Sequence, residues 1–212
     1  MADIPTLKKI IKFKKGMIIS TGMSIIEEIS RTYNLVSSEV PLVLMNCISE
    51  YPVNYEDMNL NVISKMIKIF PKAIIGHSDH SSELFTSFSA ITLGAKVIEK
   101  HVILDKNMKG PDQEVSIDFN QLSELVKTGK QINKTLGDIK KIHPKEKQIR
   151  AWAYRSIVSI RDIPKGKIID QNDIWCKRPG TGIPSHEMEN IIGKKTKNDI
   201  KNNSLLTWED LE

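Results

Sequence analysis

The sequence predicts an α/β protein with a parallel sheet, followed by a smaller domain rich in β-strands. Between Met17 and Leu136, short apolar runs alternate with segments of helical periodicity. The apolar runs are nearly continuous, which is typical of strands covered on both faces by crossover helices. After about Arg150, the chain changes to short strands and tight turns with little helix.

Four strands can be assigned in order, and the helices between them carry start and stop signals. The strand runs are GMIISTGM, VPLVLMNCISEY, AIIGHSD and KVIEKHVIL. We expect Ser24 to cap the helix after the first strand, with Glu27 completing a capping box. We expect Gly94 to end the helix before the fourth strand. Asp118 and Gln121 predict the start of the last helix in this part.

The C-terminal segment is predicted to be a small β-rich domain of about 60 residues, within the usual size range for a domain. Pro164, Lys165 and Gly166 form a turn signal. A brief helix is expected to begin at Ser185 and to end at Gly193.

Composition limits the classes of function. Of the 212 residues, 40% are hydrophobic and 27% are charged, as in ordinary soluble proteins that bury a core. The sequence has no apolar run of about 18 residues, so we expect no membrane span. The N-terminus also lacks a signal-peptide core, so we expect a cytoplasmic protein in which Cys47 and Cys176 are reduced and at least half buried.

The charge distribution raises the question of nucleic-acid binding. The net charge is +5, and much of the excess lies between Lys127 and Arg150. The pattern has neither the interleaved aromatic residues nor a motif of a nucleic-acid site. We therefore interpret this segment as a solvated helix and linker, and we expect no nucleic-acid partner.

The strongest functional signal is a polar cluster where the predicted strands end. His80 and His101 end the third and fourth strands, and Asp112 follows in KGPDQEVSI. Active sites of parallel α/β folds lie at the carboxyl ends of the strands. Two imidazoles and a carboxylate there favour a divalent metal such as Mn²⁺ or Zn²⁺ beside a polar substrate. The alternative is a pair of structural or surface histidines.

Strand parity extends this cluster. Side chains alternate across a strand, so residues two apart share a face. Hydroxyl groups at these strand ends suit phosphate or carboxylate oxygens. The residues expected to converge are Ser20 with Thr21, Ser49 with Tyr51, Ser78 with His80, and Glu99 with His101.

These residues carry a resemblance to a known family. The segments ISTGMS, YPVNYED, IGHSDH and GAKVIEKHVILDKNMKGPDQEVS, then RSIVSIRDIPKG and KRPGTG, resemble the sialic acid synthase family, in order. The resemblance implies the C-terminal half of a (β/α)8 TIM barrel over residues 1–126 and a helix end and basic linker over residues 127–150. It implies a small β-clip, antifreeze-like (SAF) domain over residues 151–212.

The resemblance also implies a reaction. Phosphoenolpyruvate is expected to condense with an N-acetylated hexose such as N-acetylmannosamine, giving a nine-carbon 2-keto sugar acid and phosphate. Mn²⁺ is the expected cofactor, with Mg²⁺ or Co²⁺ as alternatives, held by His80 and His101. The implied catalytic carboxylates are Glu99 and Asp112.

Substrate contacts are implied in the same way. Phosphoenolpyruvate is expected at Ser20, Ser49 and Ser78, and the sugar at Tyr51, Asp112, Trp152 and Arg178. Arg178 is expected to reach the site of a partner subunit in a domain-swapped homodimer. Each residue also has an ordinary alternative: helix capping for the serines, packing for the aromatic residues, solvent exposure for Arg178, an ion pair for Glu99 and a turn for Asp112.

Two departures from the family pattern bear on function. The family commonly has an Asn where this chain has Ser49. The family barrel has eight strands and the sequence supplies four, so the first four strands and their phosphate-binding lysines are expected to be missing. An open half barrel exposes sheet edges and an apolar face. We therefore expect complementation by an N-terminal half, dimerisation, or a gene fragment.

A second class of function stays open. A truncated, non-catalytic paralogue would keep an SAF domain that binds a sugar or a protein. An upstream reading frame that encodes the missing strands would favour the synthase, and its absence would favour the binding module.

Overall fold

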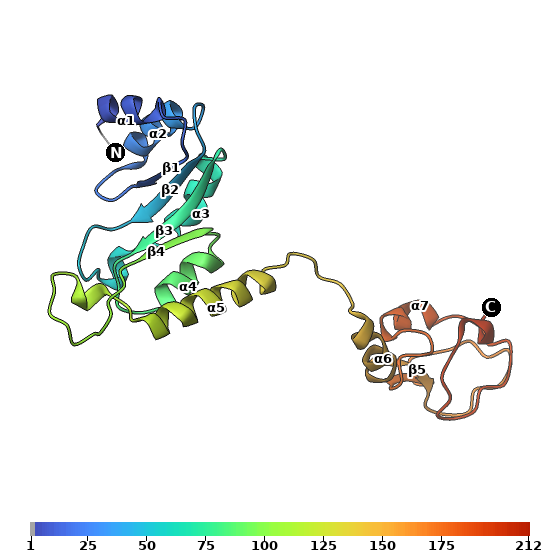
Figure 1. Ribbon diagram of the computed structural model, residues 1–212. Coiled ribbons are helices and arrows are strands. Elements are labelled where there is room, and N and C mark those ends of the chain that lie inside the picture. Colours follow the sequence, from blue (N-terminus) through green and yellow to red (C-terminus); the bar gives the residue numbers. More distant parts are fainter. Residues whose placement is uncertain (1–2) are drawn as a thin grey trace. The chain divides into compact units, whose positions relative to one another are not determined.

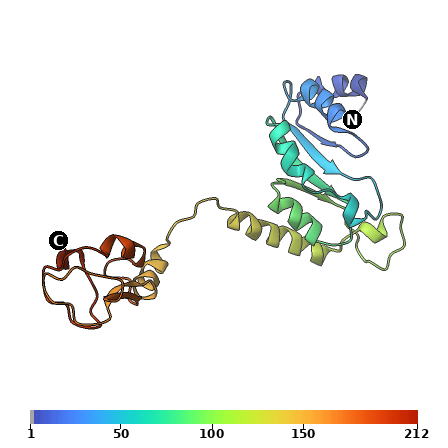
Figure 2. The same ribbon diagram turned by 180° about the vertical axis from the view of Figure 1, so that it is seen from behind.

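The computed structural model describes residues 3–212. The chain divides into two compact units: unit 1 ends at Asp138, and unit 2 runs from Ile139 to Glu212. Each unit has its own secondary structure and core, and each is described by itself (Figure 1 and Figure 2).

Unit 1 is built on a parallel sheet, which confirms the prediction. Its four strands lie in chain order, β1-β2-β3-β4. Their bounds are β1 Met17–Ser20, β2 Leu42–Cys47, β3 Ala73–Asp79 and β4 Val97–Lys100. Cys47 is the register partner of Ser78, and Ser78 is the partner of Glu99. Because register partners in adjacent strands point to the same side of the pleat, these three residues share one face of the sheet.

Helices pack against the other face. Ile29 of α2 and Met66 of α3 lie in one core with Leu44 of β2 and Ile75 of β3, and each of the four is at most 3% exposed. The helices of unit 1 are α1 Ile4–Ile11, α2 Ile26–Val36, α3 Val62–Ile69, α4 Phe85–Thr92 and α5 Phe119–Thr135, with the 3-10 turns η1 Tyr55–Asp57 and η2 Gln113–Val115.

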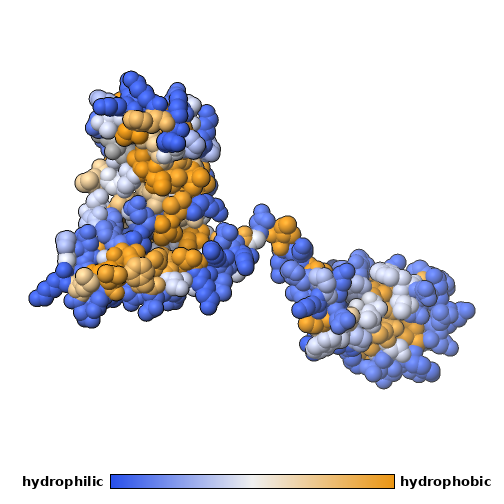
Figure 3. Space-filling view, in the orientation of Figure 1, coloured by the Kyte–Doolittle hydropathy of each residue, from blue (hydrophilic) through white to orange (hydrophobic). Residues whose placement is uncertain are grey.

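The face of the sheet opposite the helices is open. Ile18 is 62% exposed and Ile74 is 51% exposed, whereas their neighbours Ile19 and Ile75 are 8% and 2% exposed. Apolar residues gather across the strand region of unit 1 in Figure 3. Helices on one side and an exposed apolar face on the other are the geometry of half a parallel barrel.

Two of the predicted helix signals are confirmed. Asp118 caps α5 by accepting a hydrogen bond from the Gln121 N–H at 2.8 Å, and the Gln121 side chain accepts one from the Asp118 N–H at 3.1 Å. Gly94 follows α4 with a φ of 109°, the left-handed conformation that glycine adopts without steric strain.

The cap predicted for α2 was wrong by one residue. The N-cap is Ile25, whose N–H donates to Glu28 at 3.1 Å. Ser24 instead donates its hydroxyl to the Gly22 carbonyl at 3.3 Å. The turn after β1 therefore uses the Ser24 hydroxyl, and Glu28 rather than Glu27 satisfies the backbone at the helix start.

Unit 2 is a β-rich unit with little helix, as predicted. The antiparallel pair β5 Ser156–Ser159 and β6 Ile174–Lys177 is supplemented by isolated bridges such as Ile163 with Ile200. Its helical segments are α6 Pro144–Ala153, η3 Ser185–Glu187, α7 Met188–Ile191 and η4 Trp208–Asp210. Its core consists of Ile157, Ile163, Ile169, Ile174, Ile183, Ile191, Ile200, Leu206 and Leu211.

Helix α6 occupies the end of the segment that the sequence identified as a basic linker.

Both cysteines are free; Cys47 is buried and Cys176 is partly buried. Within residues 3–212, no helix combines the length and the apolar character needed to cross a membrane.

Candidate functional site

The carboxyl ends of β3 and β4 bring four of the predicted site residues together. The hydroxyl of Ser78 donates to Glu99 Oε1 at 2.6 Å. His80 and His101 lie one residue beyond the ends of β3 and β4, and their ring centroids are 5.4 Å apart. The shared parity predicted from the sequence therefore places both imidazoles above the Ser78–Glu99 pair, at the end of the open sheet face.

His80 is held in a defined orientation. Its Nδ1 lies 2.7 Å from the carbonyl oxygen of Ile48, which accepts a hydrogen bond, so Nδ1 carries a proton. In the neutral ring, Nε2 then keeps its lone pair. The hydroxyl of Tyr51 lies 3.1 Å from that Nε2, and the two rings stack with centroids 4.0 Å apart. His80 is 5% exposed, so the surrounding residues hold the ring in place.

His101 completes the cluster from the neighbouring strand. Its Nδ1 lies 3.6 Å from Asp112 Oδ2, and its ring meets Tyr51 edge-on with centroids 5.7 Å apart. The pKa of the Tyr51 hydroxyl is raised chiefly by its partial burial, and further by electrostatic interaction with Cys47 and with the carboxylates of Asp112 and Glu99. Tyr51 therefore stays protonated at neutral pH and can donate a hydrogen bond.

The two histidines fit part of a metal site. A ligating histidine typically donates its other ring N–H to a carbonyl or carboxylate, which is the arrangement of His80 with Ile48. Within residues 3–212, no group of three or more His, Cys, Asp or Glu side chains is arranged to hold a metal ion. The described residues thus offer two neighbouring imidazoles to a divalent ion.

The serines predicted to bind phosphoenolpyruvate lie in different settings. Ser78 is buried and engaged with Glu99. Ser20 is exposed at the end of β1, in register with Met45 of β2. Ser49 is exposed and lies against Gly22, where an added Cβ would collide with its hydroxyl. Glycine at position 22 is therefore what allows the turn after β1 to approach Ser49.

Trp152 and Arg178 come together within unit 2. The guanidinium carbon of Arg178 lies 5.1 Å from the centre of a Trp152 ring, and its Nε donates to the Ala153 carbonyl at 3.2 Å. Trp152 is 56% exposed and Arg178 is also exposed. The guanidinium therefore lies over the aromatic ring in a cation–π arrangement, and both side chains remain exposed to solvent.

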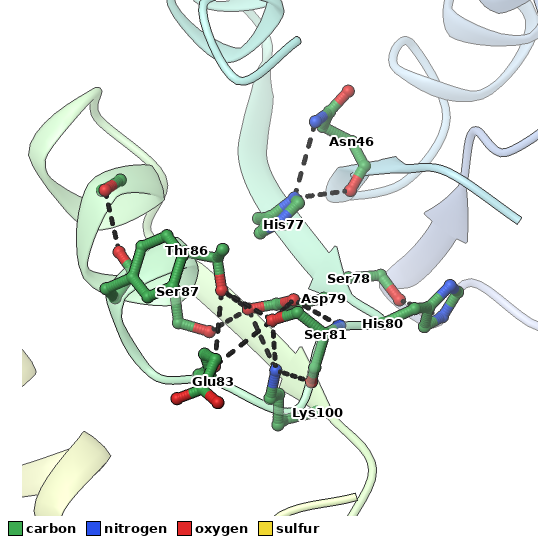
Figure 4. Close-up of polar contacts among 12 residues, drawn as sticks. Asn46, His77, Ser78, Asp79, His80, Ser81, Glu83, Thr86, Ser87 and Lys100 are labelled. Atoms are coloured by element: carbon green, nitrogen blue, oxygen red, sulfur yellow. Dashed lines mark hydrogen bonds and ion pairs between the residues drawn. The ribbon is translucent and has the colours of Figure 1, made fainter. Parts of the chain in front are cut away.

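The sequence interpretation missed a buried polar cluster on the helix-facing side of the same strands. Asp79 and Lys100 are register partners, and their charged atoms lie 3.1 Å apart with side chains 0% and 2% exposed. Strand parity could have found them, because each follows a site residue by one position and so faces the helices. Figure 4 shows this cluster beside Ser78 and His80.

His77 and Asn46 belong to the same buried side. His77 Nδ1 lies 3.1 Å from the Asn46 carbonyl oxygen, and its Nε2 is buried without a hydrogen-bond partner among the described residues. Burial lowers the pKa of His77, although negative charge at Asp79 opposes the shift. The ring is thus held neutral under the sheet.

Comparison with known proteins identifies the relatives of this chain. The model of the NeuB family matches residues 1–141, and that of the SAF domain matches residues 154–212. An uncharacterised protein of Methanocaldococcus jannaschii is 40% identical over 210 residues, covering 98% of this chain and 62% of that protein. The N,N'-diacetyllegionaminic acid synthase of Campylobacter jejuni is 36% identical over 211 residues, covering 97% and 63%.

A solved structure supports the same assignment. The N-acetylneuraminic acid synthetase of Leptospira borgpetersenii, solved in complex with citrate, is 30% identical with a TM-score of 0.65, covering 69% of this chain and 52% of that protein. The chain spans a little over 60% of the length of the first two relatives. It belongs to the NeuB family of sialic, legionaminic and pseudaminic acid synthases and carries an SAF domain at its C-terminal end.

Proposed function

We propose that this chain supplies metal- and substrate-binding strands of a synthase that condenses phosphoenolpyruvate with an N-acetylated hexose. The products would be a nine-carbon 2-keto sugar acid and phosphate. The observation that carries the proposal is the cluster at the ends of β3 and β4, where His80 and His101 lie 5.4 Å apart beside the Tyr51 hydroxyl. Two relatives are named as an N,N'-diacetyllegionaminic acid synthase and an N-acetylneuraminate-9-phosphate synthase, which supports a reaction of this class.

His80 and His101 would hold a divalent cation through ring nitrogens, with Mn²⁺ as the first choice and Mg²⁺ or Co²⁺ as alternatives. A cation bound there would supply Lewis-acid polarisation of the sugar aldehyde. The Ile48 carbonyl supports this role, because it fixes the tautomer that keeps a lone pair on Nε2 of His80, and the cation would replace the Tyr51 hydroxyl as the partner of that nitrogen. Asp112 of the GPD turn lies 3.6 Å from His101 Nδ1, beyond hydrogen-bond distance, and would act on that ring by its charge.

The remaining side chains would position the two substrates. Tyr51 would donate to a sugar hydroxyl, because its raised pKa keeps the proton on the phenol. Glu99 and Asp112 would accept hydrogen bonds from the sugar or from the attacking water. Serine hydroxyls would donate to the phosphate and carboxylate of phosphoenolpyruvate, at Ser20, Ser49 and Ser78.

The proposed reaction balances without a redox partner. C3 of phosphoenolpyruvate attacks the aldehyde carbon of the sugar and forms the new carbon–carbon bond. Water adds to C2, and the bond between C2 and the phosphate oxygen breaks. One water is consumed for each phosphate released, so phosphate release reports the reaction directly.

We also propose that Trp152 and Arg178 act on the sugar in the site of a second subunit, as the family resemblance implies. Their apposition in unit 2 supports a shared ligand, because both side chains are exposed and face each other. The synthase would then be a domain-swapped homodimer, or would be completed by an N-terminal half of the barrel.

The decisive experiment supplies the part of the barrel that the relatives contain and these 212 residues do not. The chain would be joined to the preceding segment of the Campylobacter jejuni synthase to form a chimera. The chimera, phosphoenolpyruvate, Mn²⁺ and either N-acetylmannosamine or its 2,4-diacetamido analogue would be assayed for phosphate release. We expect sugar-dependent turnover on the order of one per second. The chimera with His80→Ala and His101→Ala is the matched control.

Two outcomes of this assay would overturn the proposal. One is a folded chimera that releases no phosphate with either sugar. The other is an equal rate in the double-alanine control, which would remove the metal role from the two histidines. A preference for the diacetamido sugar would place the chain with the legionaminic branch.

A non-catalytic binding module is the second candidate, and one observation favours it. The Trp152–Arg178 pair forms within unit 2 alone. Unit 2 by itself would then bind an N-acetylated hexose, which chemical-shift changes at the Trp152 indole N–H would report. The synthase proposal expects this binding to be weak without the barrel, so submillimolar affinity of isolated unit 2 would favour the module.

A further inference from the structure

A buried ion pair lies directly behind the candidate metal ligands. Lys100 Nζ and Asp79 Oδ2 are 3.1 Å apart, and their side chains are 2% and 0% exposed. Burial alone would raise the pKa of Asp79, but Lys100 and the hydroxyls of Ser87 and Thr86 lower it, so the carboxylate is ionised. A buried pair of this kind contributes little net stability, because desolvation offsets the attraction.

The carboxylate of Asp79 organises the loop that follows β3. Its Oδ1 accepts from the N–H and the hydroxyl of Ser81, at 2.9 and 2.8 Å. Its Oδ2 accepts from the hydroxyls of Thr86 and Ser87 in α4, each at 2.6 Å. Lys100 adds a hydrogen bond to the Ser81 carbonyl oxygen and one to its hydroxyl at 3.2 Å (Figure 4).

These contacts fix residues that are adjacent in sequence to both candidate metal ligands. His80 lies between Asp79 and Ser81, and both of these neighbours are fixed by the cluster. His101 directly follows Lys100. On the opposite face of the sheet, Ser78 and Glu99 join the same two strands at 2.6 Å. The ends of β3 and β4 are therefore tied together on both faces, immediately before the two imidazoles.

We propose that Asp79 and Lys100 are positioning residues that fix the separation of the His80 and His101 rings, and thereby set the affinity of the site for a divalent cation. This inference rests on the proposed role of the histidines. The pair acts through the backbone and not by contact with substrate, because both side chains point to the helix-covered face. Displacing a ligand ring weakens metal binding even when the ligand itself is unchanged.

The first test removes the pair without leaving a buried charge. Asp79→Asn combined with Lys100→Met keeps similar volumes and makes both groups neutral. Mn²⁺ alone is titrated into the full chain, and free Mn²⁺ is measured by electron paramagnetic resonance. We expect the dissociation constant to rise by about tenfold or more, the usual effect of losing groups that orient metal ligands. Circular dichroism and thermal unfolding verify that the variant is folded at the titration temperature.

A milder pair of variants provides a matched control on one helix. Ser87→Ala removes one hydroxyl that reaches Asp79 from α4. Ser89→Ala removes a hydroxyl of the same helix that bonds only to the Phe85 carbonyl among its described partners, at 2.8 Å. We expect Ser87→Ala to weaken Mn²⁺ binding by about threefold, less than the usual tenfold or more, because Asp79 keeps its bonds to Ser81 and Thr86. Ser89→Ala is expected to leave it unchanged.

The outcomes separate this inference from the proposed function. If wild type does not bind Mn²⁺, or binds it equally with His80→Ala and His101→Ala, the metal role itself fails. If wild type binds through the histidines and a folded Asp79→Asn, Lys100→Met chain binds equally well, the positioning role is overturned. If that double variant does not fold, the serine pair decides, and equal affinity of Ser87→Ala and Ser89→Ala overturns the inference.

Discussion

Unit 1 and unit 2 bury their hydrophobic cores in different ways. The core of unit 1 lies on one side of its sheet, and the other side exposes Ile18 and Ile74. Unit 2 closes its core locally, because its short strands and bridges surround nine buried isoleucine and leucine residues. Unit 1 therefore exposes an apolar surface, whereas unit 2 has the local, closed core of a compact domain.

The contrast also separates the functional groups. Unit 1 holds the candidate metal ligands at the open end of its strands, supported by a buried network on the covered face. Unit 2 offers the exposed pair Trp152 and Arg178, which rests on one backbone hydrogen bond to the Ala153 carbonyl. The cluster in unit 1 is backed by a buried hydrogen-bonded network, whereas the pair in unit 2 lies on the surface.

The largest effect is expected from adjacent residues on opposite faces of β3. Ile75→Glu places a carboxylate in the core of unit 1, where it has no partner, and should cost about 4 kcal/mol or more of unfolding free energy. Ile74→Glu lies on the open face and should leave the fold intact while reducing self-association of the chain. Urea unfolding and light scattering measure the two effects. Equal destabilisation by both variants would mean that the open face is covered in solution.

The second prediction tests whether the core of unit 2 is independent. Ile174→Ala removes a side chain that is 0% exposed, and should destabilise unit 2 by about 2–5 kcal/mol. Ile168→Ala, at a position that is 63% exposed, is the control and should have little effect. Hydrogen exchange resolves the two units. A comparable loss of protection in unit 1 after Ile174→Ala would contradict their independence.

The third prediction concerns the surface site of unit 2. In the chimeric synthase, Arg178→Ala should raise the KM for sugar, because losing a charged hydrogen bond costs about 1.5–3 kcal/mol. Arg178→Lys keeps the charge but not the planar fork, so it should recover part of the loss. The unfolding free energy of unit 2 should change by less than about 0.5 kcal/mol, because the residue is exposed. An unchanged kcat/KM for sugar would remove Arg178 from the site.

The smallest effect is a difference in acid sensitivity between the units. Burial lowers the pKa of His77 in the folded state. As the pH falls below the unfolded pKa of about 6.5, the unfolded chain therefore binds more protons than the folded chain. Unit 1 should therefore lose stability below about pH 6.5. His77→Gln should reduce that pH dependence, which urea unfolding at pH 5 and pH 7.5 would reveal.

Unit 2 should respond in a different pH window. Burial alone would raise the pKa of Asp173 in unit 2. The Asp170 N–H, Lys167 and Arg161 together lower it by more, so the net shift is downward. The stability that this carboxylate contributes is present above its unfolded pKa of about 3.9 and is lost as the pH falls through the lower folded value. An equal loss of stability in both units between pH 7 and pH 5 would contradict the assignment to His77.

Much of the fold of this protein could be predicted from its sequence. The parallel strands, the capping box of Asp118 and Gln121, and the change to a β-rich domain all follow from local periodicity and turn chemistry, which need no knowledge of partners. The alternation of side chains along β3 and β4 also predicted that His80 and His101 lie at the same end of the sheet and on the same face. Family motifs also indicated the sialic acid synthase family, which the NeuB family model and the relatives confirm.

Tertiary structure decided the features that depend on what lies across the sheet. The Asp79–Lys100 pair needed the register of β3 with β4 and the helix that covers them, because a charged residue can be buried only where its partners meet it. The stacking of Tyr51 on His80 likewise depends on how the loop after β2 returns over β3. Sequence periodicity determines which face a residue takes, but packing between distant segments determines which groups it contacts there.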